Sequence, residues 1–306
     1  MFFRQAELAK TKVKEFMKNT SLMLFGCNTR RPILKRILTE SQIMNISISF
    51  CLYSDISFNF DDDFKILLRG EPLDSAPDAV ILDWPGPFLS FRNILADYFS
   101  REKIFVLNGY SVVKWSSLNK LSQTYELQRL GIATIPTSCS GNSRRLIQTT
   151  NKSSMVIKSI FGAEGDEVFN VTSSNAMLDI LHIYNPEELL LQPLIKNLKE
   201  FRVVVIGDHA VGAVEKEPAL GDFRGNKAKG AIFKAVPIPP IIDEVSVKCC
   251  KIFECDFAGV DIFWDECNSP MVIEVNRYLG IGGVEEATGL NISYMLLDWI
   301  KKEIEK

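Results

Sequence analysis

The sequence predicts an α/β first third followed by a region of strand hairpins. Short apolar runs alternate with amphipathic segments up to residue 107, as in chains that form a parallel sheet. After residue 150, apolar runs come in neighbouring pairs joined by short turns that contain Gly, Asn or Pro. With 306 residues, 46% of them hydrophobic, the chain is large enough to bury the cores of two or three compact lobes.

The first third alternates between predicted strands and amphipathic segments. Residues 1–19 carry apolar positions at helical spacing and predict a helix. Strands separated by helices favour a parallel sheet, whose ligands gather at the carboxyl ends of the strands. The predicted strands are residues 21–26, 46–53, 78–82 and 104–107, and the segments between them include a basic amphipathic one at 31–38 and a helix at 91–99.

A turn and a helix connect this region to the rest of the chain. The Asn-Gly pair at residues 108 and 109 is typical of a turn. Residues 117–130 predict a helix that ends at Gly131, after which residues 132–136 are extended. The stretch 137–154 is rich in Ser, Thr and Asn and predicts a connection around a short helical piece.

A lysine and two glycines stand between two predicted strands. The first strand ends in Lys158, Gly162 and Gly165 bracket a loop, and residues 168–171 begin the second strand. A lysine beside a Gly-rich turn offers a point charge and free backbone N–H groups to phosphates. Walker A loops and dinucleotide fingerprints both open a helix, so this loop is neither of them. The alternative is a hairpin with a surface lysine.

Basic residues gather on the strands and loop that follow, within residues 189–239. An apolar strand reaches Gln192 and Pro193, and strands at 201–206 and 209–214 form a hairpin across a Gly-Asp turn. The cations are either a solvated face or the partner of an anionic ligand such as a polyphosphate. They are Arg202, Lys216, Arg224, Lys227 and Lys229.

Oxygen ligands interrupt the two apolar strands between Phe257 and Asn276. Asp261 lies within the first strand, and Glu274 and Asn276 lie two residues apart in the second. Because strand side chains alternate between faces, Glu274 and Asn276 share one face, and a hairpin can bring Asp261 beside them. Two carboxylates and an amide oxygen suit a hard cation such as Mg²⁺. The alternative is a pair of edge strands whose polar residues face water.

Charge and cysteine content exclude several classes of protein. A net charge of −3 without a long basic run argues against nucleic-acid binding. Seven cysteines without a C-x-x-C pair favour reduced thiols over a disulfide framework or a zinc site. No apolar run reaches membrane-spanning length, and charges interrupt the N-terminal segment, so neither membrane association nor a signal peptide is expected. We therefore expect a cytoplasmic protein.

Six segments occur in an informative order: LNK at 118–120, VIKSIFGAEG at 156–165, GDFRGNKAKGA at 221–231, AGVDIF at 258–263, VIEVN at 272–276 and GVEEATGLNIS at 283–293. In order and spacing they resemble the ATP-grasp ligases, specifically the branch similar to the ribosomal-protein glutamate ligase RimK. The resemblance extends over residues 20–306. The combination of the six segments is specific for this family, although no single segment is.

The resemblance implies an α/β N-terminal pre-ATP-grasp domain followed by a two-lobed α+β ATP-grasp fold. In that fold ATP lies between two antiparallel sheets. The implied limits are 1–112 for the extra helix and the pre-ATP-grasp domain, and 113–306 for the ATP-grasp domain. The latter divides into a small lid-bearing subdomain, 113–190, and a metal- and substrate-binding subdomain, 191–306.

The resemblance also implies how the nucleotide is bound. Lys120 and Lys158 would contact its phosphates, and the loop from Gly162 to Gly165 would cover them as a lid. The segment beside adenine would consist of Gln192, Pro193, Leu194 and Ile195.

Catalytic and metal-binding roles follow from the same resemblance. Arg202 and Arg224 would stabilise the transferred phosphoryl group, with Asn226 nearby. The implied cofactors are ATP and Mg²⁺, as one ion or two, with Mn²⁺ as a substitute. The implied magnesium ligands are Asp261, Glu274 and Asn276.

The implied chemistry is activation of a carboxylate as an acyl phosphate, followed by attack of an amine to give an amide. The expected partners are a small-molecule or peptide carboxylate and an amino-acid amine donor such as glutamate. Since family members often form dimers or tetramers, a homo-oligomer is left open. The alternative function is an ATP-binding regulatory module without ligase turnover.

The basic loop at residues 220–231 predicts an anion-binding role beyond the nucleotide. The loop and the strands before it carry more cations than a triphosphate needs once Lys120, Lys158 and magnesium are counted. These cations are Arg202, Lys216, Arg224, Lys227 and Lys229. We therefore expect Lys216, Lys227 and Lys229 to grip an acidic substrate. The alternative is that Lys227 and Lys229 merely solvate a mobile loop.

Overall fold

The computed structural model describes residues 20–28, 32–61, 63–73, 76–150, 154–162, 165–195, 199–264 and 269–306. The helix predicted over residues 1–19 and the lid residues Ala163 and Glu164 lie outside these ranges. The chain divides into two compact units, Met1–Gly109 with Ser293–Lys306, and Tyr110–Ile292. The domain limits inferred from the sequence stay predictions.

The first unit is built on a parallel sheet, as the alternating pattern predicts. Its strands are β1 (Thr20–Gly26), β2 (Ile46–Leu52), β6 (Ala79–Leu82) and β7 (Phe105–Leu107), and the helices are α2 (Pro32–Ile43), α3 (Leu89–Arg101) and α10 (Ile292–Ile304). The strand order is β2-β1-β6-β7, and all three pairings are parallel. All four residues of β6 are buried, which is typical of a parallel strand covered on both faces.

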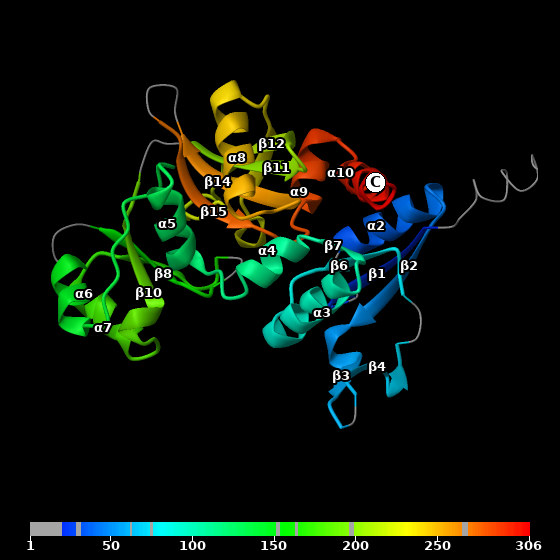
Figure 1. The fold of residues 1–306 in the computed structure, drawn as a ribbon. Coiled ribbons are helices and arrows are strands. Elements are labelled where there is room, and N and C mark those ends of the chain that lie inside the picture. Colours follow the sequence, from blue (N-terminus) through cyan, green and yellow to red (C-terminus); the bar gives the residue numbers. More distant parts are fainter. Residues whose placement is uncertain are drawn as a thin grey trace, which may run out of the picture. The chain divides into compact units, whose positions relative to one another are not determined.

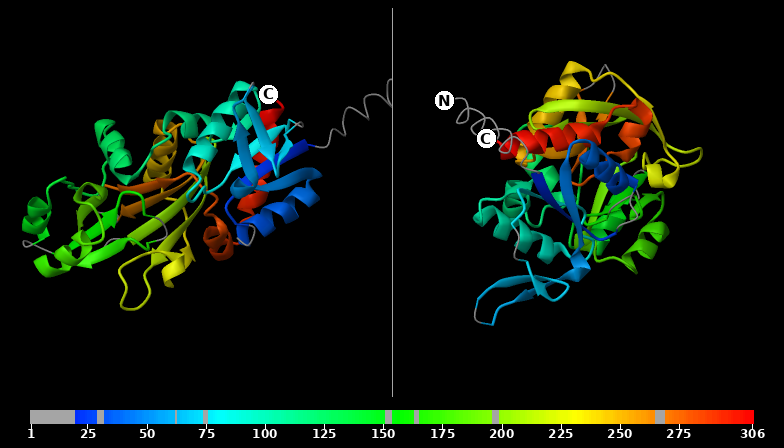
Figure 2. Two further views of the ribbon diagram at one scale, coloured as in Figure 1. Left: turned by 90° about the horizontal axis from the view of Figure 1, so that it is seen from below. Right: turned by 90° about the vertical axis from the view of Figure 1, so that its right-hand side faces the viewer.

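A small three-stranded antiparallel sheet in this unit is not predicted from the sequence. It consists of β3 (Ile56–Asn59), β4 (Lys65–Leu68) and β5 (Glu71–Pro72), after a 3₁₀ turn at Tyr53–Asp55. Strands of two to four residues are too short for their alternation to stand out. The β3–β4 hairpin extends away from the parallel sheet of the same unit (Figures 1 and 2).

The second unit contains two antiparallel sheets. The smaller one consists of β8 (Met155–Ser159), β9 (Val168–Val171) and β10 (Leu189–Pro193), in the order β10-β8-β9. The larger one consists of β11 (Lys199–Ile206), β12 (His209–Glu217), β13 (Ile232–Ala235), β14 (Phe257–Trp264) and β15 (Met271–Asn276), in the order β13-β12-β11-β14-β15. An α/β unit and a unit with two antiparallel sheets confirm the predicted fold class.

Helices complete the second unit. They are α4 (Gly109–Lys114), α5 (Lys120–Arg129), α6 (Ser143–Thr150), α7 (Ser174–Leu181), α8 (Pro240–Ile252) and α9 (Gly282–Thr288), with 3₁₀ turns at Pro186–Glu188 and Lys227–Lys229. Helix α5 begins at Lys120 rather than at residue 117, because Asn119 caps it: its side chain accepts from the Ser122 N–H at 3.0 Å. No helix in the described ranges is long and apolar enough to cross a membrane.

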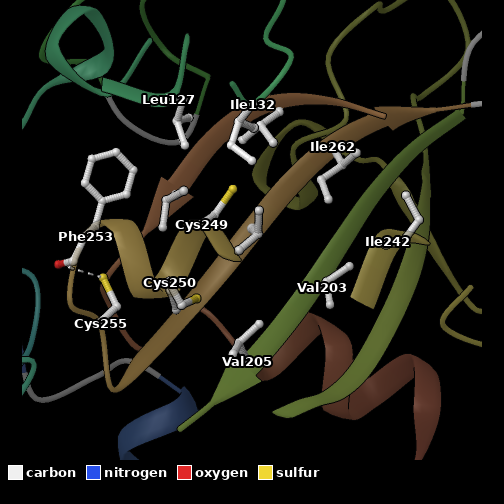
Figure 3. Close-up of a cluster of buried hydrophobic side chains, with 14 of the residues drawn as sticks. Leu127, Ile132, Val203, Val205, Ile242, Cys249, Cys250, Phe253, Cys255 and Ile262 are labelled. Atoms are coloured by element: carbon white, nitrogen blue, oxygen red, sulfur yellow. Dashed lines mark hydrogen bonds between the residues drawn. The ribbon is translucent and has the colours of Figure 1, made fainter. Parts of the chain in front are cut away.

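The larger sheet buries one face against α8. Val203 and Val205 of β11 and Ile262 of β14 share a core with Cys249 of α8 and with Phe253 at the end of that helix (Figure 3). Because side chains alternate along a strand, the residues between these apolar ones point to the opposite face. That opposite face carries the candidate site.

The smaller sheet is arranged in the same way. Met155 and Ile157 of β8 pack with Leu146 of α6 and Met177 of α7. Lys158, the next residue along β8, therefore points away from this core.

The core beneath the larger sheet predicts a large effect of truncating Phe253. Its side chain is fully buried and its ring centroid lies 5.6 Å from that of Trp115, edge to face. Phe253→Ala should lower the free energy of unfolding by about 3–5 kcal/mol, measured by urea denaturation. Ile183→Ala, at a residue that is 77% exposed, is the control and should change it by less than about 0.5 kcal/mol. Equal stability of the two variants would contradict this packing.

Candidate active site

One face of the larger sheet carries the polar residues that the sequence singles out. Arg202 of β11 stands opposite Asp261 of β14, which stands opposite Glu274 of β15. Directly opposed residues share a face, and Asn276 shares it with Glu274 two residues away. Asn276 stands opposite Gly259, and its Nδ2 donates to Oε1 of Glu274 at 2.8 Å. The structure thus brings the three predicted metal ligands together.

This donor set suits a hard cation that brings further ligands with it. Asp261 is buried, while Glu274 and Asn276 are half-buried and accessible. In the part of the chain that the structure describes, no three His, Cys, Asp or Glu side chains gather as a metal cage. Mg²⁺ commonly binds one or two carboxylates and completes its shell with water and substrate phosphate. The residues present therefore fit Mg²⁺ accompanied by phosphate.

Asp261 belongs to a buried ion-pair network. Arg202 donates to it bidentately, from Nε to Oδ1 at 2.7 Å and from Nη2 to Oδ2 at 2.6 Å. Lys216 of β12 places its Nζ 3.0 Å from Oδ2 of Asp261 and 2.7 Å from Oε1 of Glu200. The sequence predicts Arg202 and Lys216 as ligand contacts but predicts neither their pairing with Asp261 nor a role for Glu200. These partners come from three different strands, so no local pattern reports them.

The network keeps its members charged. Burial opposes the ionised form of Asp261, but Arg202 and Lys216 outweigh it and lower the pKa of this carboxyl. Burial also opposes the charge on Arg202, and the carboxylates of Asp261, Glu274 and Glu200 outweigh it and raise the pKa of the guanidinium. A buried charge of either sign is tolerated because its partner is present.

Lys158 of the smaller sheet comes within electrostatic range of this cluster. Burial lowers the pKa of Lys158, Glu274 and Glu200 oppose that shift, and Lys120 and Lys216 add to it. Its ammonium group forms no hydrogen bond or ion pair with the residues that the structure describes. Lys158 is therefore a half-buried cation, between two sheets, that is available to an external anion.

Gln192 lies on the same side of the smaller sheet as Lys158. It stands opposite Val156 in the pairing of β10 with β8, which places it on the face away from the core. Its buried side chain donates from Nε2 to Oγ1 of Thr137 at 2.9 Å. Pro193 ends β10, and the Leu194 N–H donates to the carbonyl of Ser154. Ile195 is the last described residue before the gap at 196–198.

Lys120 lies against the glycine segment. Its backbone N–H donates to the carbonyl of Ile160 at 3.2 Å, and its ammonium donates to the carbonyl of Gly162. Gly165 has a φ of +76°, and a Cβ on it would lie 2.5 Å from Oδ1 of Asn226. Only glycine tolerates both that backbone conformation and that close approach. Gly165, one of the two predicted lid glycines, therefore lies beside Asn226.

Arg224 connects the basic loop to the lid segment. Its Nη1 donates to the carbonyl of Gly165 at 3.0 Å, and its Nη2 forms an ion pair with Asp222 at 2.7 Å. The hydrogen bond from Arg224 holds the pKa of Asp222 well below its usual range. Arg224 thus lies beside Gly165 of the predicted lid. Its role as a phosphoryl contact stays a prediction.

The exposed Lys227 and the half-buried Lys229 of the loop also have carboxylate partners. Lys227 pairs with Glu286, and Lys229 pairs with Asp166 of the lid segment. The hydrogen bond from Lys229 lowers the pKa of Asp166. Exposed ion pairs contribute little, so a substrate anion can compete for these lysines.

The buried Arg277 directly follows β15. Its contacts could not be predicted from the sequence. Nη1 of Arg277 donates to the carbonyl of Ser111 at 2.7 Å, and Nη2 donates to that of Trp115 at 3.2 Å. Each of these carbonyls also accepts a backbone N–H, that of Ser111 from Trp115 and that of Trp115 from Leu118, both at 3.0 Å. Arg277 therefore ties the end of β15 to α4.

The ion-pair network predicts a stability loss with a definite pH dependence. Arg202→Met leaves Asp261 buried with Lys216 alone, so the free energy of unfolding should fall by about 3–5 kcal/mol at pH 7. Because the pKa of Asp261 is lowered in the folded state, the stabilisation is present above the unfolded pKa of about 3.9 and is lost as the pH falls through the folded value. The penalty should therefore shrink in denaturation curves measured at progressively lower pH.

The double variant Arg202→Met/Asp261→Leu is the matched control for this prediction. It removes both charges and should recover most of the lost stability at pH 7. A single variant as stable as the parent protein would show that the pair does not stabilise the sheet.

Comparison with known proteins places the chain in a family. Residues 114–300 match the family model described as the RimK-like ATP-grasp domain. The chain is 31% identical over 194 residues to a probable alpha-L-glutamate ligase of Citrobacter koseri, which covers 62% of this chain and 63% of that protein. It is 30% identical over 184 residues to a ribosomal protein bS6–L-glutamate ligase of Escherichia coli, covering 59% and 60%. These matches span less than two thirds of the length of either curated relative.

A solved structure agrees on the fold. The ATP-grasp ligase PsnB, complexed with Mg, ADP and a phosphomimetic variant of a minimal precursor, superposes with a TM-score of 0.72. The match covers 94% of this chain and 99% of PsnB at 14% sequence identity. It therefore supports a shared fold and nothing further. The family model covers more than half of the 306 residues. The chain belongs to the RimK-like ATP-grasp family.

Proposed function

We propose that this chain is an ATP- and Mg²⁺-dependent ligase that joins a carboxylate to an amine and releases ADP. The carrying observation is the ammonium of Lys158, which has no hydrogen-bond or ion-pair partner among the described residues and lies within electrostatic range of Glu274 on the other sheet. A polyphosphate would pair with the ammonium of Lys158, and a cation bound to that phosphate would be held by Glu274. The family and the glutamate-ligase names of the relatives support the same chemistry.

The nucleotide would bind with its phosphates at Lys120 and Lys158. Lys120 already donates to the Gly162 carbonyl, so the lid segment lies within reach of the same phosphates. Gly162 and Gly165 would bring backbone N–H groups close to them, as a glycine-rich turn allows. The adenine side would be formed by Gln192, Pro193, Leu194 and Ile195.

Mg²⁺ would be held by Asp261, Glu274 and Asn276. When bound, it neutralises charge on the phosphate oxygens during transfer. The two oxygens of Asp261 already accept three hydrogen bonds from Arg202 and Lys216, which leaves Glu274 and Asn276 as the more available donors. A second ion and replacement by Mn²⁺ belong to this proposal.

The reaction would proceed in two transfers. A carboxylate oxygen attacks the γ-phosphorus, the bond to the β-phosphate oxygen breaks, and ADP leaves an acyl phosphate behind. A neutral amine then attacks the acyl carbon, phosphate leaves, and the nitrogen loses a proton to give an amide. Arg202, Arg224 and Asn226 would stabilise the phosphoryl group during the first transfer, since fixed positive charge and hydrogen-bond donors are the main catalytic need there.

The substrates would be an acidic amine donor such as glutamate and a carboxylate on a small molecule, carrier or peptide. The names of the relatives support a glutamyl donor and a protein acceptor, and PsnB is complexed with a peptide precursor. Lys227 and Lys229, whose partners are exposed, would exchange them for a substrate carboxylate. Lys216 is buried between two carboxylates, so its contribution to substrate binding would pass through Glu200 and Asp261.

The first test is ADP release by the purified chain with a panel of amino acids and peptide carboxylates. We expect sustained release over many turnovers only when a carboxylate, an amine and Mg²⁺ are all present, because the acyl phosphate must react with the amine before the next turnover. Glu274→Gln should reduce it by about 100-fold, comparable to losing one preorganised electrostatic contact. Glu254→Gln, at an exposed pair with Lys114, is the control and should match the parent. ATP binding without ADP release for any pair would favour the regulatory-module alternative.

The second test concerns Lys158. Lys158→Met keeps the aliphatic stem and removes the charge, so it should weaken ATP binding or slow turnover by about 100-fold. Isothermal titration with ATP and the ADP assay measure the two effects separately. Lys302→Ala, at an exposed lysine paired with Asp298, serves as the control. Unchanged titration together with unchanged turnover would leave Lys158 as a surface lysine.

A further inference from the structure

A glutamine outside the predicted site pairs with the backbone of the metal strand. The side chain of Gln123, on α5, accepts from the Val275 N–H at 2.8 Å through Oε1 and donates to the Val275 carbonyl at 3.2 Å through Nε2. Val275 stands between Glu274 and Asn276 in β15. We propose that Gln123 is a positioning residue that holds the backbone of β15 so that Glu274 and Asn276 face the metal. The inference rests on the proposed function.

The pairing takes the place of a missing neighbour strand. β15 is the last strand of the larger sheet, so one of its two edges has no strand partner. Backbone N–H and C=O groups on such an edge need other partners when they are buried. Gln123 satisfies both groups of Val275 with one amide, and the Ala133 carbonyl accepts from the Val272 N–H at 2.9 Å further along. The edge is therefore covered at two points, one of which lies between the ligands.

Because Val275 lies between Glu274 and Asn276, its contact with Gln123 also fixes the direction in which these two side chains point. Its side chain is buried in the core of the larger sheet, and its two neighbours point to the opposite face. A rotation of the Val275 backbone would therefore swing Glu274 and Asn276 together. Both groups of Val275 are held by a buried side chain, so that rotation is opposed by two hydrogen bonds away from water.

The same helix carries the nucleotide lysine. Lys120 is the first residue of α5, and Gln123 lies one turn further on. Lys120 contacts Gly162 in the lid segment of the smaller sheet, while Gln123 contacts β15 of the larger sheet. Helix α5 thus sets the phosphate-binding lysine and the metal strand relative to each other. Supports of metal ligands act in this way when they orient ligands without touching the metal.

The test compares Gln123→Met with matched variants of the full chain. Met keeps the length and apolar body of the side chain and removes both hydrogen bonds. Gln128→Met is the control on the same helix, because Gln128 donates its amide to Oγ1 of Thr134 at 2.9 Å and its loss leaves both hydrogen bonds of Gln123 to Val275 in place. Phe253→Leu is the second control, because it loosens the same core and removes neither of the two hydrogen bonds between Gln123 and Val275.

The first measurement is binding of Mn²⁺, as a spectroscopic substitute for Mg²⁺, to the protein with ADP by electron paramagnetic resonance. Gln123→Met should weaken Mn²⁺ binding by about 10-fold, typical for loss of a ligand support. Titration with ADP in the absence of metal should change by less than about twofold. Both control variants should bind Mn²⁺ like the parent. Equal loss in Phe253→Leu at an equal drop in Tm would reduce Gln123 to a purely structural residue.

The second measurement is hydrogen exchange of the peptide that contains residues 271–276, in the protein without metal or nucleotide. Exchange of the Val275 amide should accelerate in Gln123→Met and stay unchanged in Gln128→Met. Gln123→Glu separates the two bonds, since a carboxylate can still accept from the Val275 N–H but cannot donate to its carbonyl. It should keep the amide protected and still weaken Mn²⁺ binding.

These outcomes separate failure of the inference from failure of the proposed function. A parent protein that binds no Mn²⁺ with ADP would overturn the metal site of the proposed function and the positioning role with it. Normal Mn²⁺ binding in the parent that Gln123→Met retains within about twofold, far less than the loss typical of a removed support, would overturn the positioning role alone.

Discussion

The buried pairing of Arg202 with Asp261 is the constraint on which the site depends. A slip of one residue between β11 and β14 would move every side chain of the moved strand to the other face. Arg202 would then enter the apolar core beside α8, and Asp261 would lose its counter-charge in a buried place. Because an unpaired buried charge is costly, the network of Arg202, Asp261, Lys216 and Glu200 favours one register. Asp261 is thereby held on the face of the candidate site, where the pairing of β14 with β15 sets Glu274 opposite it.

Much of the fold follows from local sequence patterns. The apolar runs of β1, β2, β6 and β7 stand out as strands, and Gly131 has the positive φ expected just beyond a helix end. Helix α8 is not among the predicted elements, because Pro239 and Pro240 suggest a loop. Proline is nevertheless well suited to the first turn of a helix, where its missing N–H is not needed. The pairing of Val272 with Thr134 connects distant residues, so no local pattern could reveal it.

The site divides into parts that sequence periodicity reaches and parts that it does not. The period of two along a strand places Glu274 and Asn276 on one face, and a hairpin brings Asp261 beside them. Sequence periodicity does not show which lysines and arginines form ion pairs within the protein and which are available to an external anion. Lys216 and Lys158 look alike as strand lysines, yet Lys216 is buried between two carboxylates and Lys158 has no such partner among the described residues. Only the pairing of distant strands separates their roles.

Helix α5 connects the two sides of the proposed site, the phosphate side at Lys120 and the metal side at Val275. The rise between Lys120 and Gln123 is about 4.5 Å along an α-helix, and a helix transmits that spacing without deforming. Asn119 caps its first turn, and Gln123 accepts a hydrogen bond from the Val275 N–H, between the predicted ligands Glu274 and Asn276. The two sheets contribute charge of opposite sign, with Lys158 on one and Glu274 on the other. In the proposed function a polyphosphate with its cation lies between the two sheets, and α5 contacts both sides, through Lys120 beside Gly162 and through Gln123 at Val275.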